Sequence, residues 1–215
     1  MPPRIDPSLI PAAPTLDFEA ALWAAGVEAV AGIDEAGRGA LAGPVYAGAV
    51  ILPCTSAVQR DLAGVRDSKE MLPSEREHWA VRIKGRARAW AVGFASAAEI
   101  DELGIVPATR LAASRALERL LPQPGHLLID YLTLPEVATP QAWLYKGDAR
   151  SLSIAAASVL AKTARDAQLV ALHDDFPDYG FAAHKGYGTA RHRAAIAQHG
   201  PCAQHRRSFA LTGAT

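Results

Sequence analysis

Two short apolar runs of this 215-residue chain each end in acidic residues. Residues 27–33 lead into Asp34 and Glu35, and residues 126–129 lead into Asp130. Both runs have the length and apolar content of buried strands. A segment with helical spacing, residues 108–121, lies between them, so strands alternate with helices. This pattern predicts an α/β fold with a sheet of mixed strand direction, and it disfavours a helix bundle or a β-sandwich.

The remaining elements follow from periodicity, capping patterns and glycines. Residues 44–52 form a second apolar run after a glycine-rich segment, which predicts a hairpin-like pair with the first strand. Ser74 with Glu77 and Ser96 with Glu99 have the spacing of capping boxes, so we expect a helix to begin at each pair. Further strands are predicted at residues 88–94 and 141–145, and further helices at residues 152–172 and about 189–199.

Charge is balanced over the whole chain but unevenly distributed along it. Lys plus Arg and Asp plus Glu both total 22, so the net charge does not indicate a polyanionic partner. From residue 181 onward there is no acidic residue, whereas arginines and histidines recur. Such a basic segment can contact nucleic acid, although a solvated helix face is the commoner reason for it.

The cysteines and the apolar runs limit the cellular setting. Cys54 and Cys202 lie far apart without a CxxC partner, which argues against a zinc site or a disulfide framework and suits the reducing cytoplasm. No apolar run is long enough to span a bilayer, and residues 1–15 lack the pattern of a signal peptide, so no membrane partner is expected. We expect a flexible leader over residues 1–25 and one domain over residues 26–215. No apolar interface helix is evident, which favours a monomer.

The acidic residues at the strand ends are candidates for metal binding. Asp34 and Glu35 are neighbours on a strand, so they can share one site only if the strand ends or bulges there. Asp130 closes the other strand, and Asp148 precedes an Ala-rich helix, where an aspartate is a favoured N-cap. Each residue alone is also compatible with a turn or a cap. Carboxylates gathered from separate elements would repel one another without cations, and their oxygens select hard ions such as Mg²⁺ or Mn²⁺.

Three further segments have side chains or backbone suited to a phosphodiester. Gly37-Arg38-Gly39 combines a flexible backbone with a guanidinium, although such a tripeptide is more often only a turn. Ser68 and Lys69 offer a hydroxyl and an ammonium in a predicted loop, which again is compatible with a simple turn. Tyr187 lies on a glycine-flanked backbone among positive charges, where it can stack on a sugar or base or pack as an ordinary core residue.

Six segments, taken in order and with their spacing, resemble the bacterial type 2 ribonucleases H (ribonuclease HII). They are AGIDEAGRGALAGPV, RDSKEML, LLIDY, KGDARSLSIAAASVLAKTARD, YGFAAHKGYGT and HRRSF, and they extend over residues 27–209. The single pieces are unspecific, but the ordered set is very specific. The resemblance implies a ribonuclease H-like α/β fold, with a mixed five-stranded sheet flanked by helices.

The resemblance also implies an activity. Such a cytoplasmic endonuclease uses Mg²⁺ or Mn²⁺ to hydrolyse the RNA strand of an RNA–DNA hybrid. It also cuts on the 5′ side of a ribonucleotide embedded in duplex DNA. Catalysis by two metal ions would leave 5′-phosphate and 3′-hydroxyl ends.

Individual residues receive roles from the same resemblance. It implies four metal-binding catalytic carboxylates, at Asp34, Glu35, Asp130 and Asp148. The backbone of Gly37, Arg38 and Gly39 would read the ribonucleotide 2′-OH, and Tyr187 would stack on the following deoxyribose. Other matching positions, with expected backbone-phosphate or structural roles, are Ser68, Lys69, Lys162, Arg165, His205 and Arg206.

One position departs clearly from the family pattern. Tyr131 stands where the family usually has glycine after its third acidic residue, and a bulky side chain disfavours a positive φ. We expect this change to affect the local loop and substrate access more than the metal ligand. The chain also lacks a long C-terminal extension with a clamp-binding motif, so no strong sliding-clamp partner is expected.

Two alternative functions share parts of this pattern. A DNA nuclease or integrase of the same fold superfamily would use the same carboxylates but would need no 2′-OH reader. A hybrid-binding module with weak or lost catalysis would bind the duplex and leave it uncut, and Tyr131 is the only residue that favours this reading. Cleavage of a duplex with one ribonucleotide, compared with an all-DNA duplex, separates the alternatives.

Overall fold

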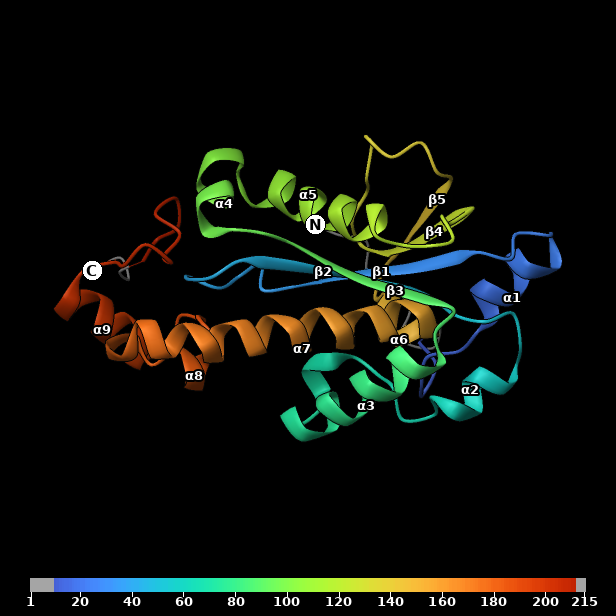
Figure 1. Ribbon diagram of the computed structural model, residues 1–215, viewed down its shortest axis with the longest axis horizontal. Helices are drawn as coiled ribbons and strands as arrows, with labels where there is room; N and C mark the ends of the chain where they lie inside the picture. Colours follow the sequence, from blue (N-terminus) through green and yellow to red (C-terminus); the bar gives the residue numbers. More distant parts are fainter. Residues whose placement is uncertain (1–9, 212–215) are drawn as a thin grey trace.

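Five strands form one mixed sheet in the computed structural model, which describes residues 10–211 (Figure 1). The strands are β1 (Val30–Ala36), β2 (Val45–Ile51), β3 (Ala89–Ala95), β4 (His126–Asp130) and β5 (Gln141–Leu144). Their order across the sheet is β3-β2-β1-β4-β5. β2 is antiparallel to both of its neighbours, whereas β1, β4 and β5 are parallel. The predicted α/β class and the mixed sheet are therefore confirmed.

Helices cover both faces of this sheet (Figure 1). The longest, α7, lies along one face, and α4 and α5 cover the other. Before the third strand come α1 (Asp17–Ala24), α2 (Ala57–Asp61) and α3 (Pro73–Arg86). After it come α4 (Ala97–Leu103), α5 (Ile105–Glu118), α6 (Gly147–Arg150), α7 (Leu152–Asp175), α8 (Phe181–His184) and α9 (Ala190–His199). Short 3₁₀ turns at Ser68–Glu70 and Pro177–Tyr179 complete the described chain.

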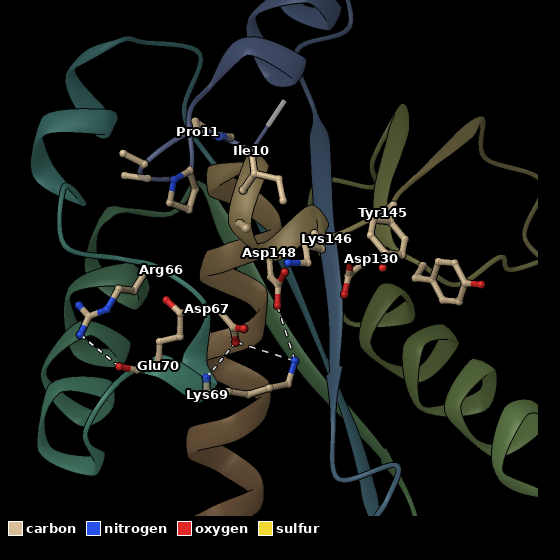
Figure 2. Close-up of a pocket in the computed structure, with 15 residues that line it drawn as sticks. Ile10, Pro11, Arg66, Asp67, Lys69, Glu70, Asp130, Tyr145, Lys146 and Asp148 are labelled. Carbon is tan, nitrogen blue, oxygen red and sulfur yellow. Dashed lines mark hydrogen bonds and ion pairs between the residues drawn. The ribbon is translucent and has the colours of Figure 1, made fainter. Parts of the chain in front are cut away.

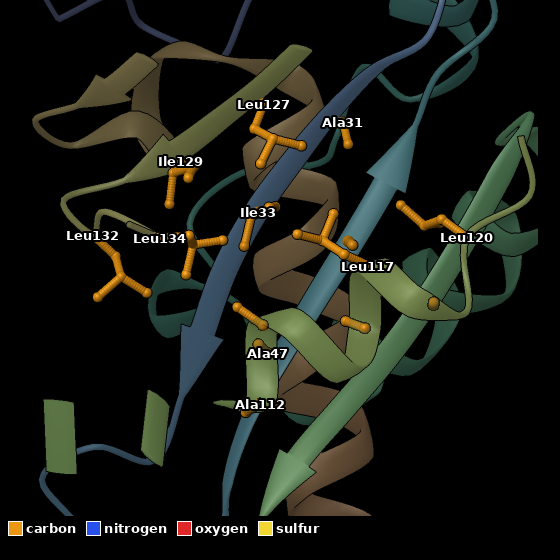
Figure 3. Close-up of a cluster of buried hydrophobic side chains, with 14 of the residues drawn as sticks. Ala31, Ile33, Ala47, Ala112, Leu117, Leu120, Leu127, Ile129, Leu132 and Leu134 are labelled. Atoms are coloured by element: carbon orange, nitrogen blue, oxygen red, sulfur yellow. The ribbon is translucent and has the colours of Figure 1, made fainter. Parts of the chain in front are cut away.

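The main core lies between the sheet and α5. Ile33 of β1 and Ile129 of β4 are paired in register and pack there with Leu117 and Leu127 (Figure 3). Burying one such side chain contributes roughly 1.5–3 kcal/mol to folding. Side chains alternate between the faces of a strand, so the burial of Ile33 on this face directs Asp34 to the opposite face, toward α7. The core thereby sets the direction of an acidic residue.

Small residues bring the N-terminal part of α7 close to β1. A Cβ at Gly32 would lie only 2.2 Å from the carbonyl carbon of Ser153, so no larger residue fits at that position. The helix presents the buried residues Ala155, Ala156 and Ala157 near this contact. This close approach places the start of α7, and α6 with Asp148 before it, beside the end of β1.

The two predicted capping boxes differ in outcome. At α4 the prediction is confirmed, because the Glu99 N–H donates to Ser96 Oγ at 3.2 Å and the Ser96 N–H donates to the Glu99 carboxylate at 2.8 Å. At α3 the prediction of Ser74 with Glu77 is wrong. Pro73 already occupies the first helical position, and Glu75 accepts from the Leu72 N–H at 2.8 Å instead.

The part of the predicted leader that the structure describes is folded, which differs from the expectation for residues 1–25. Residues 1–9 lie outside the described residues. From there on, α1 packs against the domain, and Glu19 is fully buried. Its carboxylate accepts from Ser151 Oγ at 2.6 Å and from the Ser153 N–H at 2.9 Å. Both serines lie more than 130 residues from Glu19 in the chain, so local composition does not reveal that Glu19 is buried. Within residues 10–211, no helix is long and apolar enough to cross a membrane.

Candidate active site

Three aspartates from separate elements meet at the carboxyl end of the parallel strands. The register pairs Ile33 of β1 with Ile129 of β4, so the next residues, Asp34 and Asp130, lie side by side. Asp148 arrives from α6, just after β5 (Figure 2). One oxygen from each of the three carboxylates lies within 4.8 Å of the others. We call these three residues the acidic centre.

Local hydrogen bonds fix the acidic centre. The Gly147 N–H donates to Asp130 Oδ1 at 2.7 Å. Asp148 lies inside α6 and 3.6 Å from Lys69 Nζ (Figure 2). The predicted N-cap role of Asp148 for the following helix is wrong, because Ser151 caps α7 by accepting from the Ile154 N–H at 3.3 Å. Since the cap is provided elsewhere, the Asp148 carboxylate remains directed into the acidic centre.

Burial and mutual repulsion disfavour the charged forms of the acidic centre. Burial raises the pKa of Asp34 well above its usual range, and the neighbouring charges of Glu35, Asp130 and Asp148 raise it further. Burial and the Asp148 charge raise the pKa of Asp130 to about 7. The pKa of Asp148 is also raised, first by burial and then by Asp67. Three carboxylates with raised pKa values at one point need a compensating positive charge to be ionised together.

The donor set of the acidic centre fits a divalent cation. Asp34 is only 3 % exposed, and its Oδ1 accepts from the Glu35 N–H at 2.7 Å. Its Oδ2 is buried and has no hydrogen-bond partner among the described residues. A buried carboxylate oxygen without a partner is costly, and a hard cation with oxygen ligands removes that cost.

Glu35 lies next to the acidic centre but is not one of the three grouped carboxylates. Adjacent residues of a strand point to opposite faces, as the sequence already indicated for Asp34 and Glu35. The Glu35 carboxylate accepts from the Arg38 guanidinium at 3.2 Å. The structure therefore holds Glu35 between the acidic centre and the Gly37-Arg38-Gly39 loop.

Two buried arginines, Arg165 and Arg206, fix the backbone shape of the Gly37-Arg38-Gly39 loop. Gly37 has φ +93°, and a Cβ there would lie 1.9 Å from Arg165 Nε, so both conformation and space require glycine. Arg206 donates to the carbonyl of Gly37 at 2.7 Å and to the carbonyl of Arg38 at 2.8 Å. These bonds occupy carbonyl groups of the loop and leave its N–H groups for other partners.

Arg165 and Arg206 are scaffold residues in this structure, not surface groups. Both are 0 % exposed. Arg165 donates to the carbonyls of Pro44, Lys185 and Ala42 at 3.0, 3.0 and 3.2 Å. Its guanidinium is therefore surrounded by protein and does not reach solvent. Arg206 donates a third bond, to the Gly43 carbonyl at 3.0 Å. Of the backbone-phosphate and structural roles expected for these two residues, the structure favours the structural one, because the donors of both guanidinium groups are directed at backbone carbonyls inside the protein.

The other predicted binding residues surround a cleft of about 590 Å³. Its lining includes Glu35, Gly37, Arg38, Gly39, Ser68, Lys69, Lys162 and Tyr187. Ser68 itself is buried and hydrogen-bonds Ser158 at 2.8 Å, whereas the Lys69 side chain is 69 % exposed. Lys69 also lines a second cleft of about 520 Å³ that contains Asp130 and Asp148 (Figure 2). The two clefts therefore meet at Lys69, above the acidic centre.

Tyr187 is positioned by cations and by a chain of histidines. Lys162 Nζ and the Arg165 guanidinium each lie 5.2 Å from the centre of its ring. His192 Nδ1 lies 2.9 Å from the Tyr187 carbonyl, and since a carbonyl only accepts, Nδ1 carries the proton. His192 Nε2 therefore accepts from His205 Nε2 at 3.1 Å. The opposite ring nitrogen of His205, Nδ1, accepts from the Cys202 N–H at 3.0 Å, so both histidines have fixed, neutral tautomers.

Two sets of contacts beside the clefts were not predicted from the sequence. Asp166 pairs with Lys162 at 2.7 Å and with Arg76 at 3.0 Å. The spacing of Lys162 and Asp166, one helical turn apart, was an available signal for this pair. Tyr131 has φ +43° although it is not glycine, and it contacts Trp143 and Tyr145. No local pattern predicted that these three aromatic residues meet.

Comparison with known proteins adds to this geometry. The family model described as Ribonuclease HII matches residues 31–212. Ribonuclease HII of Geobacillus thermodenitrificans (strain NG80-2) is 52 % identical over 193 residues, which cover 90 % of this chain and 73 % of that protein. The crystal structure of ribonuclease H2 from Pyrococcus horikoshii OT3 has a TM-score of 0.71 at 25 % identity and covers 85 % of this chain and 94 % of that one. RNase HII from Archaeoglobus fulgidus, solved in complex with PCNA, has a TM-score of 0.71 at 26 % identity over 86 % of this chain and 98 % of that one.

Proposed function

The chain belongs to the ribonuclease HII family and is a type 2 ribonuclease H endonuclease, and we propose that it cuts both RNA–DNA hybrids and duplex DNA with an embedded ribonucleotide. In the embedded case the proposed cut lies on the 5′ side of the ribonucleotide and leaves 5′-phosphate and 3′-hydroxyl ends. The observation that carries this proposal is the acidic centre, which lies next to a loop whose backbone can approach a sugar.

We propose that Asp34, Glu35, Asp130 and Asp148 hold two divalent cations, Mg²⁺ or Mn²⁺. The orphaned Oδ2 of Asp34 and the raised pKa of Asp130 support this assignment. Bound cations would supply the positive charge that activates water and stabilises the leaving oxygen in phosphodiester hydrolysis. The protein's own part is to hold the four carboxylates at fixed positions through β1, β4 and α6.

Recognition of the ribonucleotide is assigned to the Gly37-Arg38-Gly39 loop and Tyr187. Arg206 engages the carbonyls of Gly37 and Arg38, so the loop presents a fixed backbone with N–H groups suited to a 2′-OH. Tyr187 lines the same cleft, where its ring can stack on the adjacent deoxyribose. Lys69 and Lys162 line that cleft as well and suit phosphate contacts. Ser68, Arg165 and Arg206 support this surface from beneath.

The test is cleavage of a DNA duplex carrying one ribonucleotide, with Mg²⁺, with Mn²⁺ and with chelator. We expect metal-dependent cleavage 5′ to the ribonucleotide and none of the matched all-DNA duplex. Asp34→Asn removes a charge without changing volume and should lower kcat roughly 10²–10³-fold or more. Cleavage of the all-DNA duplex would favour a DNA nuclease, and an uncut but bound duplex would favour a binding module.

Three proposals concern the cellular setting. We propose that the protein acts in the cytoplasm, where its two free cysteines, Cys54 and Cys202, stay reduced. We also propose that it acts as a monomer. The predicted lack of a strong sliding-clamp partner concerns a tail that includes residues 212–215, which lie outside the described residues.

A further inference from the structure

An exposed cluster of aromatic rings lies beside the acidic centre. Tyr131 follows Asp130 at the end of β4, and its side chain is 48 % exposed. Its ring centre lies 6.2 Å from that of Trp143 and 5.8 Å from that of Tyr145, nearly perpendicular to both. Trp143 is 51 % exposed. We call these three residues the aromatic edge. Large apolar side chains exposed together next to a charged site are characteristic of a binding surface.

The backbone under this cluster is strained at a residue that stays half exposed. Tyr131 has φ +43°, a conformation that L side chains other than Asn and Asp rarely adopt. Its N–H donates to the Leu144 carbonyl at 3.0 Å, which holds the strained residue against β5. Since Tyr131 is 48 % exposed, burial offsets only part of this strain. Strain that the surrounding structure maintains at an exposed residue beside a reaction centre points to a role in binding.

Positive charge and continuity with the substrate cleft indicate which ligand this surface fits. A groove of about 340 Å³ runs past Tyr131 and Trp143, and Arg38 and Arg110 line it. The Arg110 Nε donates to the Thr133 carbonyl at 3.0 Å, which holds its guanidinium beside the rings. Arg38 also lines the cleft that contains Tyr187. The groove is therefore continuous with the proposed substrate surface.

We propose that the aromatic edge binds the sugar–phosphate backbone of the substrate duplex, on the arm of the duplex that Tyr187 does not contact. Tyr131 and Trp143 would pack on the sugars, and Arg110 would face the phosphates. Flat apolar rings flanked by guanidinium groups complement a polyanion with apolar sugar faces, whereas an acidic protein partner would leave the rings without a counterpart. This inference rests on the proposed function, because the duplex is the substrate assigned there.

The test compares Trp143→Ala with Trp90→Ala as a matched control. Trp90 is 40 % exposed but lies on β3, at the opposite edge of the sheet. Cleavage and binding are measured on ribonucleotide duplexes lengthened by about ten base pairs on one side or on the other. We expect Trp143→Ala to lower kcat/KM about tenfold more on one lengthened duplex than on the other, mainly through KM. Trp90→Ala should show no such asymmetry. Equal effects of Trp143→Ala on both duplexes would overturn the inference.

Tyr131→Gly separates a binding role from a packing role. Glycine relieves the positive φ, so this variant should keep or raise the Tm while weakening binding of the same lengthened duplex about tenfold. A Tm that falls together with affinity would show that the ring only packs, and would contradict the inference. Binding is measured in chelator, so the comparison of variants remains decisive even if the wild type fails to cut. Failure to cut would count against the proposed function instead.

Discussion

Buried charge is arranged in opposite ways in two regions of this protein. In the acidic centre, Asp34 Oδ2 has no partner among the described residues, and the neighbouring carboxylates raise one another's pKa. In the buried basic group, which we define as Arg165, Arg206, His192 and His205, donors meet carbonyls or ring nitrogens.

The difference shows how scaffold and site can be told apart. Both regions contain residues of the types that bind phosphate or metal. Where a buried polar group already has its partners inside the protein, its removal should affect stability. Where a buried oxygen without a partner belongs to a group of converging carboxylates, we expect a cation to complete it, and removal of that carboxylate should affect function while sparing the fold.

The largest effect is expected in the buried basic group. Arg165→Met should lower the free energy of unfolding by roughly 3–5 kcal/mol, because three backbone carbonyls lose their donor inside the protein. Arg191→Met, at an exposed position of α9, is the control and should change stability by no more than about 0.5 kcal/mol. Urea unfolding measures both. Equal stability of the two variants would mean that Arg165 is not a scaffold residue.

A smaller effect is expected from acid, through the histidine chain. Burial lowers the pKa of His192 to about 4, and it lowers the pKa of His205 as well. Because the unfolded pKa lies near 6.5, the unfolded state binds more protons as the pH falls from about 6.5 to 4. Protonation of His192 in the unfolded state therefore reduces the free energy of unfolding by up to about 1.4 kcal/mol per pH unit in that range, and His205 acts in the same direction.

Comparison with His192→Asn isolates the part of the acid-induced loss of stability that is due to His192. The raised pKa values of Asp34 and Asp130 act in the opposite direction, and the stability from the protonated form of Asp130 is lost as the pH rises through about 7. Asn can still donate to the Tyr187 carbonyl but does not titrate. Unfolding at pH 7 and at pH 4.5 should show a smaller acid loss in the variant than in the wild type. An equal loss of stability in both proteins would show that protonation of His192 does not cause the acid destabilisation.

The strand-end aspartates were predictable because strand geometry is local. Apolar runs that stop at Asp34 and at Asp130 predict two strand ends, and the parallel pairing of β1 with β4 brings these carboxyl ends together. The position of Asp148 followed only from resemblance to a family, because its local pattern equally suited an N-cap. The cap lies instead at Ser151, three residues later. A one-turn shift of a helix start is beyond what capping preferences determine.

Burial of charged side chains was not predictable in the same way. Arg165 and Arg206 are of the residue type that binds phosphate, and only the fold reveals that backbone carbonyls more than 100 residues away take their donors. Glu19 was missed for the same reason, because its serine partners follow β5 in the chain. Contacts between distant segments depend on register and helix packing, which residue composition does not encode.

The measurement closest to the central claim is the stability of Asp34→Asn without and with metal. In chelator at pH 8, Asp34→Asn should leave the free energy of unfolding unchanged or raise it, because an amide cannot add to the repulsion among the buried carboxylates. Added Mg²⁺ should then stabilise the wild type more than the variant, since a ligand that binds only the folded protein stabilises it. A variant that is less stable than the wild type in chelator, with equal stabilisation of both proteins by Mg²⁺, would contradict the account.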